Sequence, residues 1–149
     1  MQRLRITFSK RGVARFIGNL DLHRAWERTL RRAGVQMVYS QGYHPTPKLQ
    51  LASALPLGIT SEAEVLDVWM QDAIEVETFA PGVAAVLPSG ITVLKVISVG
   101  IHEKSLQSRL FAAEYTVDPS EKYSAHVLEN KVVKILARDT IVRKRRGKN

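Results

Sequence analysis

The stretch RLRITF at residues 3–8 decides the first element of the fold, because its side chains alternate strictly between polar and apolar. Leu4, Ile6 and Phe8 are apolar, and the positions between them hold arginine and threonine. Successive side chains of a strand point to opposite faces. The pattern therefore predicts a half-buried strand with one polar face.

The segment NLDLHRAWERTLRRAG at residues 19–34 predicts a helix of about 14 residues. Asn19 or Asp21 can cap its N-terminus, and Gly34 can end it. Its apolar side is formed by Leu22, Ala25, Trp26, Thr29, Leu30 and Ala33. Its opposite side carries Arg24, Arg28, Arg31 and Arg32. This is the clearest helix pattern in the chain.

Further strands are predicted at residues 36–40, 48–54, 64–71 and 91–99. Leu66, Val68 and Met70 of the third of these strands point inward. A helix is predicted at residues 79–87, although Pro81 weakens it or delays its start. The order strand, helix, strands, helix, strand is that of a split βαβ, or ferredoxin-like, unit. The predicted fold class is therefore α+β.

The later part of the chain begins this pattern again. A strand is predicted at residues 113–117, a helix capped by Ser120, and a strand at residues 140–145. The apolar side of this helix carries Val127, Leu128, Val132, Ile135 and Leu136. We therefore expect a ferredoxin-like domain at residues 1–100 and a partial second βαβ segment at residues 101–149. Either the chain is a fragment of a longer protein, or its last elements lie against the first unit.

The net charge of +8 is unevenly spread along the sequence. Residues 1–50 hold ten Lys or Arg against two acids, residues 51–100 hold one against six, and residues 101–149 hold eleven against six. Two basic blocks around an acidic one indicate a side that faces a polyanion and an opposite side that stays soluble or meets another partner. The alternative is an ordinary basic protein whose charge serves no partner.

Several classes of site are excluded by residue content. The sequence contains no cysteine, which excludes disulfides, thiolate zinc sites and iron–sulfur clusters. No HExxH motif or Gly-rich phosphate loop is present, so we expect no metal and no cofactor. Apolar runs are too short for a membrane span, and the start shows no signal-peptide pattern. We therefore expect a cytoplasmic protein without a membrane partner.

The basic residues predict an RNA-binding face. A four-stranded sheet with helices on one side leaves its other side open, and RNA can bind such a surface by phosphate contacts and base stacking. Possible stacking rings are Tyr39, Tyr43 and Trp69. The candidate RNA-binding residues are Arg3, Arg5, Lys10, Arg11, Arg24, Arg28, Arg31, Arg32, Tyr43, His44 and Lys48, with Arg143, Lys144, Arg145 and Arg146 in the basic tail. Solvated arginines that only maintain solubility are the alternative.

The loop at residues 41–48 is predicted to be the functional hot spot. Its two prolines stiffen it, so Tyr43, His44 and Lys48 can be presented with little ordering cost. The alternative is a stiff turn whose Tyr43 covers the edge of the core. His44 is also the candidate general acid or base for a metal-independent RNA cleavage, although no acid adjacent in sequence orients it.

A second hypothesis concerns the acidic strand at residues 62–67. Glu62, Glu64 and Asp67 predict an acidic edge that is solvated or faces a partner. In this hypothesis the protein is an interaction adaptor, the acidic edge binds the partner, and the basic face is a solubility device.

Several motifs together resemble a known family. They lie at residues 8–12, 15–17, 20–22, 27–28, 30–33, 40–43, 45, 47–48 and 52–58. This pattern is similar to an uncharacterised bacterial family of radical-SAM-linked proteins, densely over residues 1–100 and more loosely over residues 141–148. Its members occur fused to, or encoded beside, a cobalamin-type radical SAM protein, and often near a ribonuclease of the E/G type. The resemblance implies a radical SAM partner and a role in RNA processing or modification.

The resemblance also bears on catalysis. The family has no established catalytic residue, and its members usually continue past Asn149. Many members carry Ser-His in place of Gly18-Asn19, and Asn in place of His44, which argues against His44 as an obligatory catalyst. In fold only, the chain is also similar to CRISPR repeat-processing endonucleases, whose Gly-rich loop is represented here by Gly147 alone. We therefore expect a non-catalytic RNA-binding or substrate-presenting module that works with a radical SAM enzyme.

Overall fold

The computed structural model describes residues 1–118 and 123–142 and divides the chain into two compact units, Met1–Ala112 and Ala113–Asn149. The first unit contains β1 (Gln2–Lys10), the 3-10 turn η1 (Gly12–Phe16), α1 (Asn19–Arg32), β2 (Leu49–Leu51), β3 (Ser61–Met70), α2 (Val76–Ala84), β4 (Ile91–Val99) and α3 (Leu106–Arg109). The second unit contains α4 (Ala125–Leu136). Residues 101–112, which the sequence assigned to the second segment, belong to the first unit.

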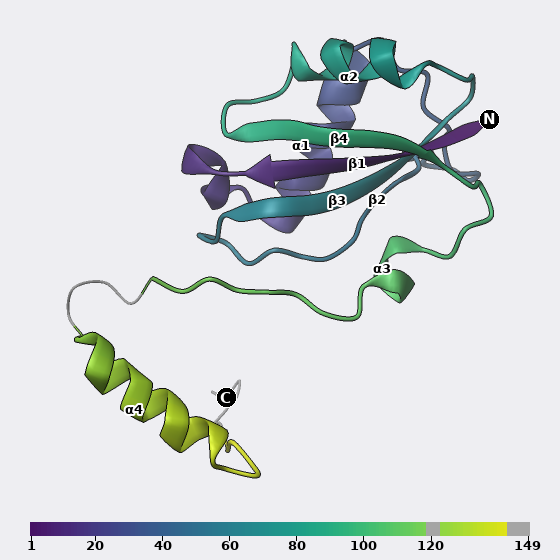
Figure 1. Ribbon diagram of the computed structural model, residues 1–149. Coiled ribbons are helices and arrows are strands. Elements are labelled where there is room, and N and C mark those ends of the chain that lie inside the picture. Colours follow the sequence, from purple (N-terminus) through teal and green to yellow (C-terminus); the bar gives the residue numbers. More distant parts are fainter. Residues whose placement is uncertain (119–122, 143–149) are drawn as a thin grey trace. The chain divides into compact units, whose positions relative to one another are not determined.

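The first unit is built on a four-stranded sheet with the order β2-β3-β1-β4. Every neighbouring pair is antiparallel. In the register, Leu4 lies opposite Val68 of β3, and Ile6 lies opposite Val96 of β4. Figure 1 shows α1 behind the sheet and α2 alongside β4. The predicted α+β class is therefore confirmed.

The core lies between the sheet and the two helices α1 and α2. Residues Leu4, Ile6 and Phe8 are fully buried, as the alternation in β1 predicts. They share one cluster with Trp26 of α1 and Phe79 of α2. The rings of Phe8 and Trp26 meet edge to face at 4.9 Å, which adds about 1 kcal/mol beyond the buried area. This packing buries the apolar side of α1 and directs its arginines to solvent.

Helix α1 ends as predicted but begins differently. Gly34 has a φ of +73°, and the N–H groups of Gly34 and Val35 donate to the carbonyls of Arg31 and Leu30 at 3.1 and 3.0 Å. These two bonds form a Schellman motif, which glycine closes without steric cost. The residue that caps the N-terminus is Gly18, so neither predicted side-chain cap is used.

Several predicted elements differ in the structure. Residues 36–40 form only the isolated bridges Met37 to Met70 and Tyr39 to Pro47. At the second bridge Pro47 has no N–H to donate. Helix α2 begins before Pro81 and contains it, since burial of its apolar side compensates for the lost bond. Residues 113–117 form no strand, and neither do residues 140–142, the described part of the strand predicted at residues 140–145. The strand predicted at residues 48–54 is shortened to β2.

The face of the sheet opposite α1 is partly covered. Residues 100–110, which we call the strap, fold across it and place α3 against β2 and β3. Leu106 is buried there, and its N–H donates to Oε1 of Gln50 at 3.2 Å. The Gln107 amide donates to the carbonyl of Leu51 at 3.1 Å. The expectation of a free sheet face is therefore wrong where the strap lies.

The second unit contains the predicted amphipathic helix as α4, with Ser124 as its N-cap residue. The predicted cap Ser120 lies outside the described residues. Also outside them lie Arg143, Lys144, Arg145 and Arg146. Across residues 1–118 and 123–142, no helix combines the length and apolarity that a membrane crossing requires.

Candidate nucleic-acid interface

The outward side of α1 carries four exposed arginines. Two of them pair with acids of the same helix, Arg24 with Asp21 at 3.5 Å and Arg31 with Glu27 at 2.7 Å. The other two, Arg28 and Arg32, form no ion pair with any residue that the structure describes, and they stand one helical turn apart. These two guanidinium groups are therefore available to an external anion.

The C-terminal end of α1 is joined to the segment that carries the predicted hot-spot loop. Arg31 interacts with Tyr39, and this contact, followed by that with Glu27, raises the pKa of the Arg31 guanidinium. Tyr39 in turn forms a bridge with Pro47, at the far end of the loop. The C-terminal end of α1 is therefore linked through Tyr39 to the base of the loop.

The loop is closed at its base by hydrogen bonds. The N–H of Lys48 donates to the carbonyl of Val38 at 2.7 Å, and the N–H of Ser40 donates to the carbonyl of Thr46 at 2.8 Å. The Thr46 N–H also donates to the Ser40 hydroxyl at 3.0 Å. A closed base limits how far the tip of the loop can spread.

Tyr43 stands at the tip of this loop with 94% of its surface exposed. Its ring meets that of His44 edge to face at 4.8 Å. The alternative in which Tyr43 covers the edge of the core is therefore contradicted. His44 is exposed, and no carboxylate in residues 1–118 or 123–142 is hydrogen-bonded to it. The pair offers two rings to a ligand rather than an oriented proton-transfer group.

The arginines of β1 lie in a different environment, under the strap. Asp67 is fully buried and accepts hydrogen bonds from both Arg3 and Arg5, at 2.5 to 2.9 Å. Arg3 also donates to the carbonyls of Glu103 and Lys104, at 2.7 and 3.2 Å. The hydrogen bond to Asp67 raises the pKa of Arg5, despite the opposing effect of burial. Arg3 makes these hydrogen bonds within the fold and has almost no exposed surface.

Trp69, a predicted stacking ring, is also covered. The guanidinium of Arg3 lies 4.5 Å from its ring centroid, and the Nζ of Lys48 lies 4.8 Å from it. Each such contact contributes on the order of 0.5–2 kcal/mol. The buried ring of Trp69 thus makes cation–π contacts with two side chains within the fold, and Lys48 itself remains exposed.

Two further predicted contacts, Lys10 and Arg11, differ in exposure. Lys10 has no exposed surface, and its Nζ donates to the carbonyl of Ile17 at 2.8 Å. Burial lowers the pKa of the Lys10 ammonium, although the charge of Glu64 opposes the shift. Arg11 is exposed and pairs with Glu62 at 2.9 Å. Lys10 therefore stabilises the chain around η1 and does not face solvent.

The three acids of the predicted acidic edge do not form one exposed edge, because they differ in burial. Glu62 is exposed and Glu64 is partly buried, whereas Asp67 lies beneath the strap. The alternation of side chains along β3 could have predicted the face on which Asp67 lies. Because Leu66 and Val68 point into the core, Asp67 between them must point to the opposite face, which also carries Arg3 and Arg5. In the part of the chain that the structure describes, no three His, Cys, Asp or Glu side chains gather at metal-binding distance.

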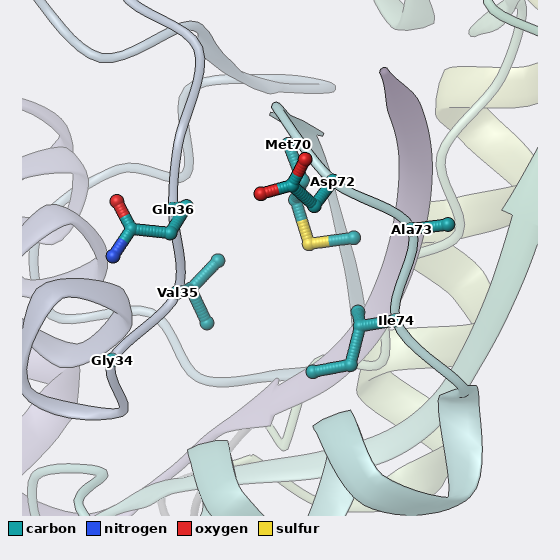
Figure 2. Close-up of a pocket in the computed structure, with 7 residues that line it drawn as sticks. All are labelled: Gly34, Val35, Gln36, Met70, Asp72, Ala73 and Ile74. Carbon is teal, nitrogen blue, oxygen red and sulfur yellow. The ribbon is translucent and has the colours of Figure 1, made fainter.

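A cavity of about 170 Å³ lies between the end of α1 and the end of β3. Figure 2 shows the side chains of Val35, Met70 and Ile74 around it, with the carboxylate of Asp72 nearby and the amide of Gln36 pointing away from these side chains. The volume is below the roughly 300 Å³ at which small-molecule pockets begin. None of the candidate arginines lines this cavity.

Comparison with known proteins gives one family match. The family described as "Uncharacterized protein conserved in bacteria (DUF2344)" matches residues 3–149. No curated protein matches the chain.

Proposed function

The chain belongs to the bacterial family DUF2344, and we propose that it is an RNA-binding module that contacts RNA through α1 and the loop at residues 41–48. The observation that carries this proposal is the pair Arg28 and Arg32, which project from one side of a helix without an acidic partner among the described residues. Guanidinium groups in this state bind phosphates with little competition from the protein itself.

The loop adds contacts of a second kind. Phosphates attract any basic surface, whereas exposed rings favour unpaired bases. Tyr43 and His44 are exposed at the loop tip, and Lys48 lies at the loop end. Cations on a helix beside aromatic rings on a closed loop suit single-stranded or looped RNA better than a regular duplex.

The proposed contact set is smaller than the set predicted from sequence. It keeps Arg24, Arg28, Arg31, Arg32, Tyr43, His44 and Lys48. It leaves out Arg3 and Lys10, because each is buried and bonded within the fold. The sheet face under the strap is not part of the proposed surface.

The proposal includes a partner enzyme. We propose that a radical SAM protein, supplied by another domain or gene, acts on the RNA that this module presents. Support comes from the resemblance of the sequence motifs, and from the absence of cysteine, which leaves this chain unable to ligate the iron–sulfur cluster of such an enzyme. The module itself would be non-catalytic.

We further propose that the first unit has the ferredoxin-like fold. The sheet order β2-β3-β1-β4, its antiparallel pairings and the helices α1 and α2 between successive strands support this assignment.

The experiment that tests RNA binding is a salt titration. Binding of a labelled single-stranded oligoribonucleotide to the full chain is measured by fluorescence anisotropy over a range of KCl concentrations. Four α1 arginines and Lys48 could neutralise about five phosphates, which predicts a log–log slope of about −3.5 for a single strand. A duplex of the same length is the control and should bind more weakly. Undetectable binding at low salt would contradict the proposal.

A further inference from the structure

Two segments of the first unit present apolar side chains to solvent where they meet. Phe16 is 61% exposed and Leu57 is 66% exposed. The N–H of Gly58 donates to the carbonyl of Arg15 at 2.8 Å, which joins the two segments. We call the exposed apolar side chains of these two joined segments the apolar patch: Val13, Phe16 and Leu20 from η1 and the first turn of α1, and Leu57 and Ile59 from the loop before β3.

The backbone beneath the apolar patch is held firmly. Ala14 is fully buried between the exposed Val13 and Phe16. Gly90 packs against η1 so closely that a Cβ at this position would lie 2.4 Å from the carbonyl oxygen of Arg11. The buried Lys10 ties β1 to the residue after η1 through its bond to the Ile17 carbonyl. The η1 side of the patch is thus organised before any partner binds, which lowers the ordering cost of binding.

An exposed group of apolar side chains on a fixed backbone is typical of a protein-interaction site. Charge indicates what kind of partner fits. Arg11 is paired with Glu62 at 2.9 Å. Arg15 lies 4.7 Å over the Phe16 ring and forms no ion pair with a described residue. Asp21 in the first turn of α1 is paired with Arg24. The guanidinium of Arg15 therefore remains for a partner, and two copies of the same surface would bring two such cations together.

We infer that the apolar patch binds a polypeptide segment in which apolar side chains are flanked by Asp or Glu. The apolar side chains of the partner would pack on Phe16 and Leu57, and its carboxylates would pair with Arg15. This inference does not depend on RNA binding, which the proposed function places on other residues. It also assigns protein docking to a surface different from the predicted acidic edge.

Synthetic peptides test this inference on the full chain. Three labelled peptides of equal length are compared by anisotropy: one of Leu, Phe and Glu, one with Lys in place of Glu, and one with Ser in place of Leu and Phe. Only the first should bind. The double variant Phe16→Ser/Leu57→Ser should weaken its binding about tenfold or more. Phe111→Ser is the matched control, since Phe111 is 98% exposed outside the patch, and should change nothing.

The remaining variants separate charge from apolar contact and this inference from the RNA proposal. Arg15→Glu should weaken binding of the Glu peptide and strengthen that of the Lys peptide. Arg28→Glu/Arg32→Glu should leave peptide binding unchanged. The inference is overturned if the Glu peptide does not bind or if the Phe16 and Leu57 changes have no effect. It is also overturned if sedimentation shows a dimer that Phe16→Ser dissociates, or if Phe16→Ser lowers RNA affinity and not peptide affinity.

Discussion

The arginines of β1 and those of α1 lie in opposite surroundings. Arg3 and Arg5 share the buried carboxylate of Asp67 beneath the strap. Arg28 and Arg32 project from α1 with no acidic partner in the described part of the chain. A guanidinium that is already bonded within the fold would lose those bonds on binding a phosphate, whereas an unpaired one would lose only water. The comparison therefore indicates a structural role for Arg3 and Arg5 and supports the binding role proposed for Arg28 and Arg32.

The largest effect that this comparison predicts is a loss of stability when the carboxylate of Asp67 is removed. Asp67→Ala leaves two guanidinium groups without their carboxylate, one of them fully buried. The free energy of unfolding should fall by about 3–5 kcal/mol, measured by urea denaturation. Glu62→Ala removes the acid of an exposed pair with Arg11 and is the control, with an expected change of at most about 1 kcal/mol. Equal effects of the two variants would show that β1 does not depend on Asp67.

A second prediction concerns the buried cation Lys10 and pH. Because burial lowers its pKa in the folded state, the unfolded chain binds more protons between that lowered value and about 10.4. Stability relative to Lys10→Met should therefore rise with pH in this window, by up to about 1.4 kcal/mol per pH unit. Urea titrations of both proteins at several alkaline pH values measure this difference. A difference that stays constant with pH would mean that Lys10 is not protonated differently in the two states.

The smallest expected effect on stability belongs to the loop beside α1. Tyr43→Ala removes a ring that is 94% exposed, so the melting temperature should change by only about 1–2 °C. RNA affinity should fall by about 5- to 10-fold, because one base of the RNA loses the tyrosine ring on which it stacks. Differential scanning fluorimetry and anisotropy on the same preparations give both values. A large loss of stability with unchanged RNA affinity would make the loop structural.

Much of the sheet and of α1 could be predicted because local patterns determine them. Alternation placed β1, and β4 was predicted at Ile91–Val99 as observed. Helical periodicity placed the buried and exposed sides of α1, with Gly34 as its stop. The segment at residues 36–40 was predicted as a regular strand. It forms only two bridges, and at one of them Pro47, opposite Tyr39, cannot donate a hydrogen bond.

The candidate site was predictable only where exposure follows from local pattern. The arginines of α1 oppose an apolar side, so their exposure could be foreseen. Arg3 lies on the sheet face that the strap covers, and the strap comes about 100 residues later in the chain. The carbonyl of Glu103 in the strap accepts a hydrogen bond from Arg3. Its carboxylate partner, Asp67, comes from another strand. No local pattern reports such long-range contacts.

Binding of a single-stranded oligoribonucleotide by two charge-reversed double variants tests the central claim most directly. Arg28→Glu/Arg32→Glu changes the proposed contact surface. Lys134→Glu/Arg138→Glu makes the same change in net charge in the second unit, at exposed residues. The first variant should weaken binding on the order of tenfold or more and reduce the salt slope by about 1.4, and the second should have a much smaller effect. Equal losses in the two variants would show that only net charge matters and would contradict an RNA-binding surface on α1.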